Sequence, residues 1–244
     1  MEELHIEELL SPNKSARQGS PICMLVYHYT GASSIGGTLA WFQDPASKVS
    51  AHYVIGREKL RNSAQTRIVR CAGHADKAWH AGKSEWRISD HLYQKTKTLP
   101  GVTWTLPRVG NWQRLITGVN RCSVGIELVG KGKSFTEEQM RTTAKLTARL
   151  IEGNALLERK NCVGHEHVSP GRKIDPGPNF DWDLLWSLVE DSQKAKVWKA
   201  TAATEITLPE RVAIRTEHRM ESGKDRRLDA LWVWWKIMRG VFWG

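Results

Sequence analysis

Two histidines and one aspartate, far apart in the 244-residue sequence, have the types and surroundings of a metal site. His28 is the next-to-last residue of the apolar run CMLVYHY, and His165 lies near the end of a second predicted strand, KNCVGHEH. Asp175 follows in the segment GHEHVSPGRKIDPGPNFDW, whose prolines and glycines prevent regular structure and favour a rigid loop. Two imidazoles and one carboxylate are the protein ligands of an open catalytic zinc site, in which water takes the fourth position.

A lysine in the same loop could act on a substrate at this metal. Lys173 is two residues before Asp175, and residues two apart in an extended segment point to the same side. We therefore expect Lys173 to face the metal, where its charge could stabilise a negatively charged oxygen that forms on a carbonyl group. The alternative is a lysine with a structural role.

A glutamate is embedded among apolar residues in the predicted strand SVGIELVG. Carboxylates such as Glu127 are rarely buried without a partner or a chemical task. Zinc lowers the pKa of a bound water to about 7, so a carboxylate at the edge of the site could take the proton of that water. The alternative is a glutamate at a strand end that forms a salt bridge.

The elements that must position these side chains can be recognised from apolar runs and helix signals. Short apolar runs predict strands, and residues 136–152 have helical spacing, a Thr136–Gln139 capping box and a C-terminal Gly153. A short helix is expected before Pro45, and Asp181 is a predicted cap of a last core helix. Strands mixed with helices predict a mixed α/β domain, with a central sheet flanked by helices. The predicted strands are 23–29, 50–56, 66–72, 123–130 and 160–167, and the last helix is 180–194.

Five segments occur in the order found in a known family of enzymes. They are SPNKSARQGSPICMLVYHYTG, VSAHYVIG, AWHAGKS, NRCSVGIELVG and GHEHVSPGRKIDPGPNFDW, spread over about residues 11–190. The chain thereby resembles the zinc N-acetylmuramoyl-L-alanine amidases, which include muropeptide-recycling amidases, phage endolysins and peptidoglycan recognition proteins. The likeness is greatest to the recycling branch, since the third ligand is Asp175 rather than a cysteine.

This resemblance implies roles for named residues. It implies one Zn²⁺ per chain at the bottom of a groove, held by His28, His165 and Asp175, with Glu127 as the base that activates water and Lys173 as the oxyanion stabiliser. Some relatives use a tyrosine on the strand that matches SAHYVIG, but Ala51 is at that position here, so Tyr53 receives no role.

The same resemblance implies substrate contacts along the groove. Trp79 could stack on sugar or peptide and His80 could bond to substrate, or both could simply shape a loop. Asn120 and Arg172 are further candidate contacts. The segment 85–119 is longer than compact relatives need. We expect partial order in it, either as an insert over the groove that selects substrate or as a surface excursion.

The composition limits the partners. The formal net charge of +10 favours an anionic partner, but the absence of long Lys/Arg runs and of nucleic-acid motifs argues against nucleic acid. The four cysteines form no C-x-x-C pair and are expected to be buried free thiols. The N-terminal residues lack the features of a secretory signal, so synthesis in the cytoplasm is expected, with action on the cell wall only after release.

The C-terminal residues 195–244 differ in character from the predicted catalytic domain, residues 11–194. Four of the twelve tryptophans fall in LDALWVWWKIMRGVFWG. Residues 228–243 could form a helix that contacts an anionic membrane surface, because about 16 residues rise only ~24 Å, less than the ~30 Å hydrocarbon core. The alternatives are docking on the catalytic domain and a dimer contact. The sequence makes no prediction of oligomeric state.

The combined interpretation is an enzyme that cleaves the amide bond between N-acetylmuramic acid and L-alanine. The charge and the C-terminal residues favour a phage or prophage endolysin that acts on peptidoglycan, and the alternative is a cytoplasmic amidase that recycles anhydromuropeptides. A peptidoglycan-binding module without activity is less consistent with a complete ligand set. Another zinc hydrolase, such as a peptidase, lacks support because no H-E-x-x-H motif is present.

Overall fold

The computed structural model describes residues 4–61, 63 and 65–195 of the chain. Contacts between residues divide the chain into two units, Met1–Gln193 and Lys194–Gly244, and the description below concerns the first. The predicted extension 195–244, with its membrane-contact segment 228–243, lies outside the described residues except for position 195.

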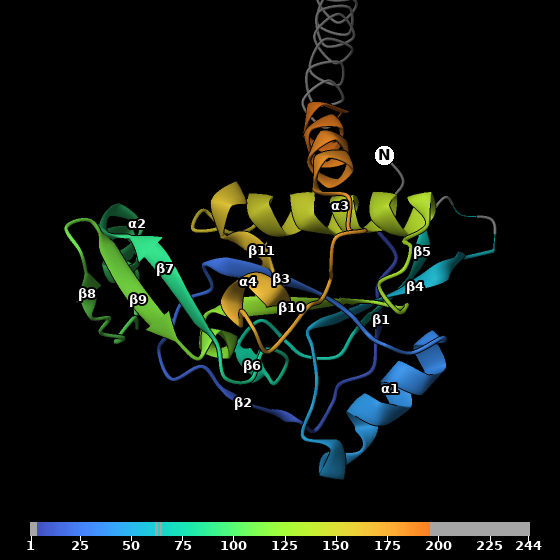
Figure 1. The fold of residues 1–244 in the computed structure, drawn as a ribbon, viewed down its shortest axis with the longest axis horizontal. Helices are drawn as coiled ribbons and strands as arrows, with labels where there is room; N and C mark the ends of the chain where they lie inside the picture. The colour runs from blue at the N-terminus through green and yellow to red at the C-terminus, as the bar shows by residue number, and fades with distance from the viewer. Residues whose placement is uncertain (1–3, 62, 64, 196–244) are drawn as a thin grey trace, which may run out of the picture. The chain divides into compact units, whose positions relative to one another are not determined.

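A six-stranded mixed sheet forms the centre of this unit, which confirms the predicted fold class (Figure 1). All neighbouring pairs are parallel except β4 and β5, which are antiparallel. Residues before the predicted domain start at residue 11 also belong to the sheet, since β1 pairs with β5 at its edge. The order across the sheet is β1 (Glu7–Glu8), β5 (Thr66–Arg70), β4 (Tyr53–Lys59), β10 (Ser123–Leu128), β3 (Met24–Tyr29) and β11 (Cys162–Gly164).

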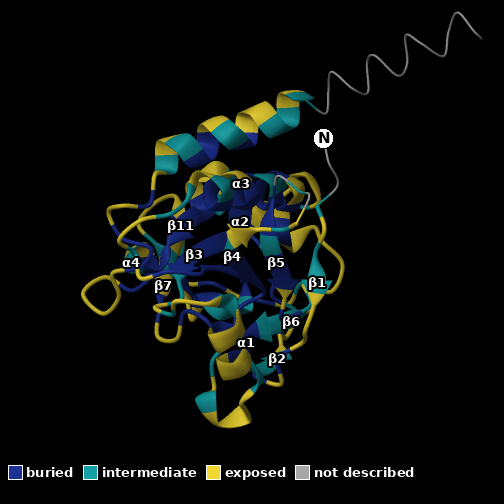
Figure 2. Cartoon of the chain, turned by 90° about the vertical axis from the view of Figure 1, so that its right-hand side faces the viewer, coloured by how far each residue is buried: buried dark blue, intermediate teal, exposed yellow. Residues whose placement is uncertain are grey.

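One face of the sheet is an apolar surface covered by helices. In β3, Leu25 and Tyr27 point to this face and pack with α3 (Glu137–Glu152) and with the helix over residues 182–195. Figure 2 shows the buried strands beneath α3. Side chains alternate along a strand, so His28 points to the opposite face. The metal ligand predicted at His28 therefore lies on the face of the sheet opposite α3.

The helix predictions are correct in position, and the structure changes one detail. The Thr136 side chain accepts a hydrogen bond from the Gln139 backbone N–H, as a cap should. The Gln139 side chain does not complete a capping box. Its amide donates instead to the carbonyl oxygens of Ile55, within β4, and Val129, just after β10. The Gln139 side chain therefore joins the first turn of α3 to both strands. Asp181 caps the last helix through the backbone N–H of Leu184.

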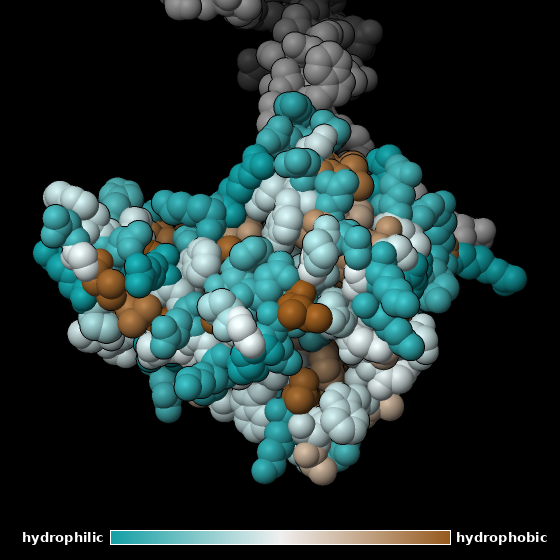
Figure 3. All heavy atoms as spheres, in the orientation of Figure 1, coloured by the Kyte–Doolittle hydropathy of each residue, from teal (hydrophilic) through white to brown (hydrophobic). Residues whose placement is uncertain are grey.

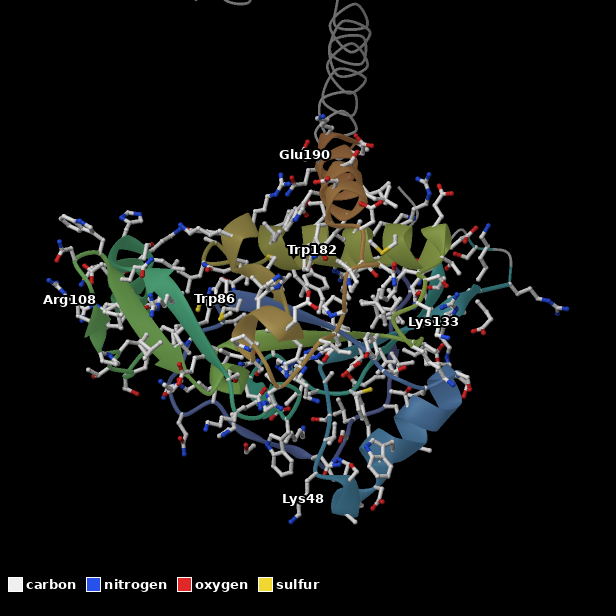
Figure 4. All side chains as sticks on the ribbon, in the orientation of Figure 1. Lys48, Trp86, Arg108, Lys133, Trp182 and Glu190 are labelled. Carbon is white, nitrogen blue, oxygen red and sulfur yellow. The ribbon has the colours of Figure 1, made fainter. Side chains whose placement is uncertain are left out.

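The second face is covered by α1 (Ile35–Gln43) and by the long segment 85–119. That segment has its own structure, which confirms the expected partial order: β7 (Glu85–Ser89), α2 (Asp90–Lys97), β8 (Arg108–Val109) and β9 (Gln113–Thr117), with sheet order β7-β9-β8. Figure 4 labels Trp86 on β7 and Arg108 on β8. The Trp86 indole N–H donates to the Asn161 side chain, and this bond ties the small sheet to the segment before β11.

The remaining elements are short. Two strands, β2 (Lys14–Ala16) and β6 (Asp76–Ala78), form an antiparallel pair. Three 3-10 turns occupy Pro45–Ser47, Val119–Arg121 and Arg159–Asn161. The predicted strand 160–167 ends early, at Gly164, and a single helical turn follows as α4 (His165–Val168). The strand cannot continue because the Glu166 backbone N–H bonds to the Asp175 carbonyl oxygen rather than to a sheet neighbour.

The surface and the cysteines agree with a folded core. All four cysteines are free and buried, as predicted. The face shown in Figure 3 is largely hydrophilic, and hydrophobic side chains reach it in several separate areas. Within the described residues, the helices are too short or too polar to span a membrane.

Candidate metal centre

The three predicted ligands converge at one end of the parallel strands. His28 is near the end of β3, His165 begins α4 directly after β11, and these two strands are neighbours in the sheet. The distance between the two Nδ1 atoms is 3.0 Å, and Asp175 Oδ2 lies 2.9 Å from His28 Nδ1 and 3.0 Å from His165 Nδ1. All three side chains are buried.

Hydrogen bonds alone do not explain the close approach of His28 Nδ1, His165 Nδ1 and Asp175 Oδ2. Each neutral imidazole carries one N–H, and its Nδ1 has at most one proton to share. Three atoms that all lie within hydrogen-bonding distance of one another therefore cannot satisfy one another in pairs. A cation bound by all three atoms would satisfy them together. A tetrahedral zinc with bonds of about 2.1 Å separates its ligand atoms by about 3.4 Å. The observed spacing is shorter by only about 0.4 Å, so the donor set and its geometry fit zinc.

The charges of the ligands also suit a metal. Burial lowers the pKa of His28 to about 4, which outweighs the neighbouring Asp175, so His28 is neutral at pH 7 and offers a lone pair. Burial by itself would raise the pKa of Asp175, but hydrogen bonds from His165 and His28 hold that pKa well below its ordinary value. The site thus presents a neutral His28 imidazole and an ionised Asp175 carboxylate, the protonation states that metal binding requires of these groups.

The loop with many prolines and glycines is fixed by contacts with α4. The Glu166 backbone N–H donates to the Asp175 carbonyl oxygen at 2.9 Å, and the Glu166 carboxylate accepts a hydrogen bond from the Gly177 N–H at 3.1 Å. At Gly164, an added Cβ would lie 2.7 Å from Pro176 Cδ. The loop therefore packs directly on the backbone of β11, and this close packing holds Asp175 beside the two histidines.

Glu127 lies on the same side of the sheet as His28. The two residues are register partners in the adjacent strands β10 and β3. Glu127 is only 8% exposed, and among the described residues its Oε2 has no hydrogen-bond partner and the side chain forms no salt bridge. Burial, with the charge of Asp175, raises the pKa of Glu127 to about 8. A buried carboxyl group with no structural partner is a candidate for a chemical task.

Lys173 is exposed at the edge of the same cluster. Its positive charge is close enough to oppose the rise in the pKa of Glu127 and to contribute to the low pKa of His28. Residues 173–175 have no helical or strand structure. Its position is compatible with the predicted orientation toward the metal, and its catalytic role stays a prediction.

The four residues predicted to contact substrate have different surroundings in the structure, and two of them are described first. Trp79 is half-buried and its indole N–H donates to the Ser15 hydroxyl. His80 is 8% exposed, and its two ring nitrogens contact His28 and Ser123, which leaves neither nitrogen free for a substrate. A substrate bond from His80 is therefore not supported.

The polar groups of the other two candidates also point to the protein. The Asn120 Oδ1 accepts a hydrogen bond from the Ala81 N–H at 2.8 Å. The exposed Arg172 donates to the carbonyl oxygens of Ala81 and Lys83 and to the Ser169 hydroxyl. Both residues therefore hold the chain next to His80 in place, and a substrate contact by either stays a prediction.

One buried residue that supports the site was not predicted. Arg17 is 7% exposed, and burial lowers its pKa to about 10. Its guanidinium donates to the carbonyl oxygens of His74, Asn120, Arg121 and Ser123, and it also contacts the His52 ring. It thus joins the segment before β3 to the start of β10. An arginine in a polar segment carries no sequence signal of burial, because its partners are backbone oxygens about 60 to 100 residues away.

Comparisons with known proteins agree with this site. The family described as N-acetylmuramoyl-L-alanine amidase matches residues 18–178, which include all three ligands. The N-acetylmuramoyl-L-alanine amidase AmiD of Escherichia coli K12 is 29% identical over 187 residues, 72% of this chain and 56% of AmiD. The 1,6-anhydro-N-acetylmuramyl-L-alanine amidase AmpD of Haemophilus influenzae is 31% identical over 144 residues, 59% of this chain and 60% of AmpD. The matches thus span a little over half the length of these curated relatives.

Solved structures show the same fold. A crystal structure of a selenomethionine derivative of AmpD has a TM-score of 0.54 and 27% identity, and the alignment covers 75% of this chain and 94% of AmpD. AmiD of E. coli in complex with anhydro-N-acetylmuramic acid-L-Ala-D-gamma-Glu-L-Lys has a TM-score of 0.53 and 27% identity, over 71% of this chain and 60% of AmiD. A mutant endolysin from Bacillus subtilis, at 17% identity and a TM-score of 0.50 over 77% of this chain and 99% of the endolysin, shares the fold.

Proposed function

Because the chain belongs to the N-acetylmuramoyl-L-alanine amidase family, we propose that it hydrolyses the amide bond between N-acetylmuramic acid and L-alanine, with one zinc ion held by His28, His165 and Asp175. The observation that carries this proposal is the convergence of three buried ligand atoms, all within 4.8 Å of one another, at the end of the parallel strands. The chemistry that zinc supplies when bound is Lewis acidity, which activates water and an amide carbonyl for hydrolysis.

Glu127 has the properties of the group that moves protons in this reaction. Hydrolysis of an amide requires a group that takes a proton from water and later returns it to the departing amine. Such a group works best when its pKa is close to the pH of the reaction, and burial brings the pKa of Glu127 to about 8. Its Oε2 has no hydrogen-bond partner among the described residues, and the positive charge of a bound zinc ion would favour the ionised form of Glu127, which accepts that proton.

Lys173 is proposed to stabilise the negative charge that develops on the carbonyl oxygen. The side chain is exposed and, among the described residues, takes part in no salt bridge. Its charge acts on both Glu127 and His28, so it is close to the place where the substrate carbonyl would lie. One donor of this kind typically contributes about 10²–10³ in rate.

The substrate that we propose is a soluble anhydromuropeptide rather than the intact cell wall. AmpD is named for the 1,6-anhydro sugar, and AmiD was solved with an anhydro-N-acetylmuramic acid peptide. The sequence-based preference for an endolysin has weaker support, because the endolysin compared above is only 17% identical and shares the fold alone. Two features favoured it in the sequence. The C-terminal residues 195–244 lie outside the described residues except for position 195, and the net charge of +10 indicates only an anionic partner.

Mass spectrometry of the reaction products tests this proposal. The full-length protein is incubated with soluble anhydromuropeptide and, separately, with intact peptidoglycan, with and without a chelator. We expect peptides with a new N-terminal L-alanine from the soluble substrate, and none when chelator is present or when the variant is Asp175→Ala. Asp183→Asn, an exposed carboxylate on the last helix, is the matched control and should retain activity. Binding without cleavage would instead indicate a recognition module, and faster cleavage of intact peptidoglycan would support the endolysin.

A further inference from the structure

Two adjacent residues, His80 and Ala81, contact the histidine ligands on the side of each ring that faces away from the metal site. His28 Nε2 is 3.0 Å from His80 Nδ1, and His165 Nε2 is 3.0 Å from the carbonyl oxygen of Ala81. These are the ring nitrogens that point away from the ligand triangle. The segment between β6 and β7, which carries His80 and Ala81, lies beside α4 (Figure 1). One short segment, 80–81, therefore meets the outer side of both imidazoles.

The chemistry of a ligand fixes the direction of each of these hydrogen bonds. An imidazole that offers its Nδ1 lone pair to a metal carries its proton on Nε2. His28 Nε2–H must then donate to His80 Nδ1, so His80 carries its own proton on Nε2. That proton goes to the Ser123 hydroxyl at 3.0 Å, and the hydroxyl donates in turn to the Val119 carbonyl oxygen at 2.8 Å. The chain of donors thus ends on a backbone carbonyl and can run in one direction only.

The position of His80 is set by the strand beneath it. An added Cβ at Gly125 would lie 2.5 Å from His80 Cγ, so the ring lies directly against the backbone of β10. Ala81 is held separately, through its N–H by Asn120 and through its carbonyl by Arg172. Arg172 also lies 3.4 Å from His165 Nε2. The acceptors for both histidine ligands are thus held in place by contacts with Gly125, Asn120 and Arg172.

We propose that His80 is a positioning residue that fixes the tautomer and ring orientation of His28, while the Ala81 carbonyl does the same for His165. This inference rests on the proposed zinc site and adds to it the residues that prepare the imidazoles for the ion. Partners of this kind typically contribute 10–100-fold in metal affinity, that is, about one to two powers of ten.

The competing explanation is that His80 only fills space above Gly125, and two variants separate the two roles. In His80→Asn, the side-chain Oδ1 takes the place of Nδ1 and can still accept from His28. In His80→Leu, the side chain has a volume similar to that of histidine but no acceptor. A positioning role requires the acceptor and a packing role requires the volume, so the two explanations rank the variants in opposite order.

The measurement is the zinc dissociation constant of the full-length protein, obtained by competition with a chromophoric chelator, with urea unfolding as a check of the fold. We expect His80→Leu to bind zinc about 10–100-fold more weakly than the unmodified protein, and His80→Asn to stay within a few-fold of it. His91→Leu, an exposed histidine on α2, is the matched control and should not change the affinity. Equal affinities for both His80 variants, or weaker binding by the Asn variant, would overturn this inference alone. A wild-type protein that does not bind zinc would overturn the proposed function as well.

Discussion

Replacement of Glu127 by glutamine should change how the stability of the metal-free protein depends on pH. Burial raises the pKa of Glu127 from 4.5 to about 8, so the folded protein keeps this proton where the unfolded chain loses it. Below pH 4.5 the carboxyl group is neutral in both states and has no effect. Between pH 4.5 and 8 the free energy of unfolding should fall by about 1.4 kcal/mol per pH unit because of this one group. Above pH 8 the full loss is about 5 kcal/mol.

The assay is urea unfolding of chelator-treated wild type and Glu127→Gln at several values between pH 4.5 and 8.5. Glutamine has nearly the same shape and no charge, so the two proteins should have similar stability at pH 4.5. The variant should then become progressively more stable than the wild type, by several kcal/mol at pH 8. Glu85→Gln, an exposed carboxylate on β7, provides the control and should show no such trend. A stability difference that stays constant from pH 5 to 8 would refute the burial argument for Glu127.

Three further substitutions test other parts of the site. Lys173→Ala should lower kcat on soluble muropeptide by about 10²–10³ with unchanged zinc affinity, and a parallel loss of zinc would show that the lysine acts on the ligands instead. Gly164→Ala places a methyl group 2.7 Å from the Pro176 ring, so it should weaken zinc binding measured by chelator competition, whereas Gly36→Ala on α1, where an added Cβ meets open space, should not. Arg17→Met removes the donors to four backbone carbonyls and should lower the free energy of unfolding by about 3–5 kcal/mol. If the free energy of unfolding falls by less than about 1 kcal/mol, which is the net contribution of a single hydrogen bond, water must replace the bonds that Arg17 made.

The sequence predicts the parts of this fold whose signals are local. Apolar runs identify β3, β5 and β10, and a Thr136 cap with helical spacing identifies α3. His165 and Asp175 can be predicted as ligands because a loop of this composition follows a histidine that comes directly after a strand. The convergence of His28 with Asp175 then depends on the pairing of β3 with β11, which the order of the motifs implies but local patterns do not.

Contacts between distant segments explain what the sequence does not predict. His80 looks like a residue of a substrate groove, yet it bonds to His28, 52 residues away. Gln139 looks like half of a capping box, yet its amide donates to the backbone carbonyls of Ile55 and Val129. In both cases a buried polar group on another element determines the side chain's partner, and such a group cannot be seen in a local window of sequence.

Anomalous diffraction at the zinc absorption edge, from crystals of the zinc-loaded protein, tests the central claim most directly. We predict one strong peak per chain, about 2.0–2.2 Å from His28 Nδ1, His165 Nδ1 and a carboxylate oxygen of Asp175. A peak bound by other residues, or a zinc-loaded protein in which one of these three side chains lies outside bonding distance, would contradict it.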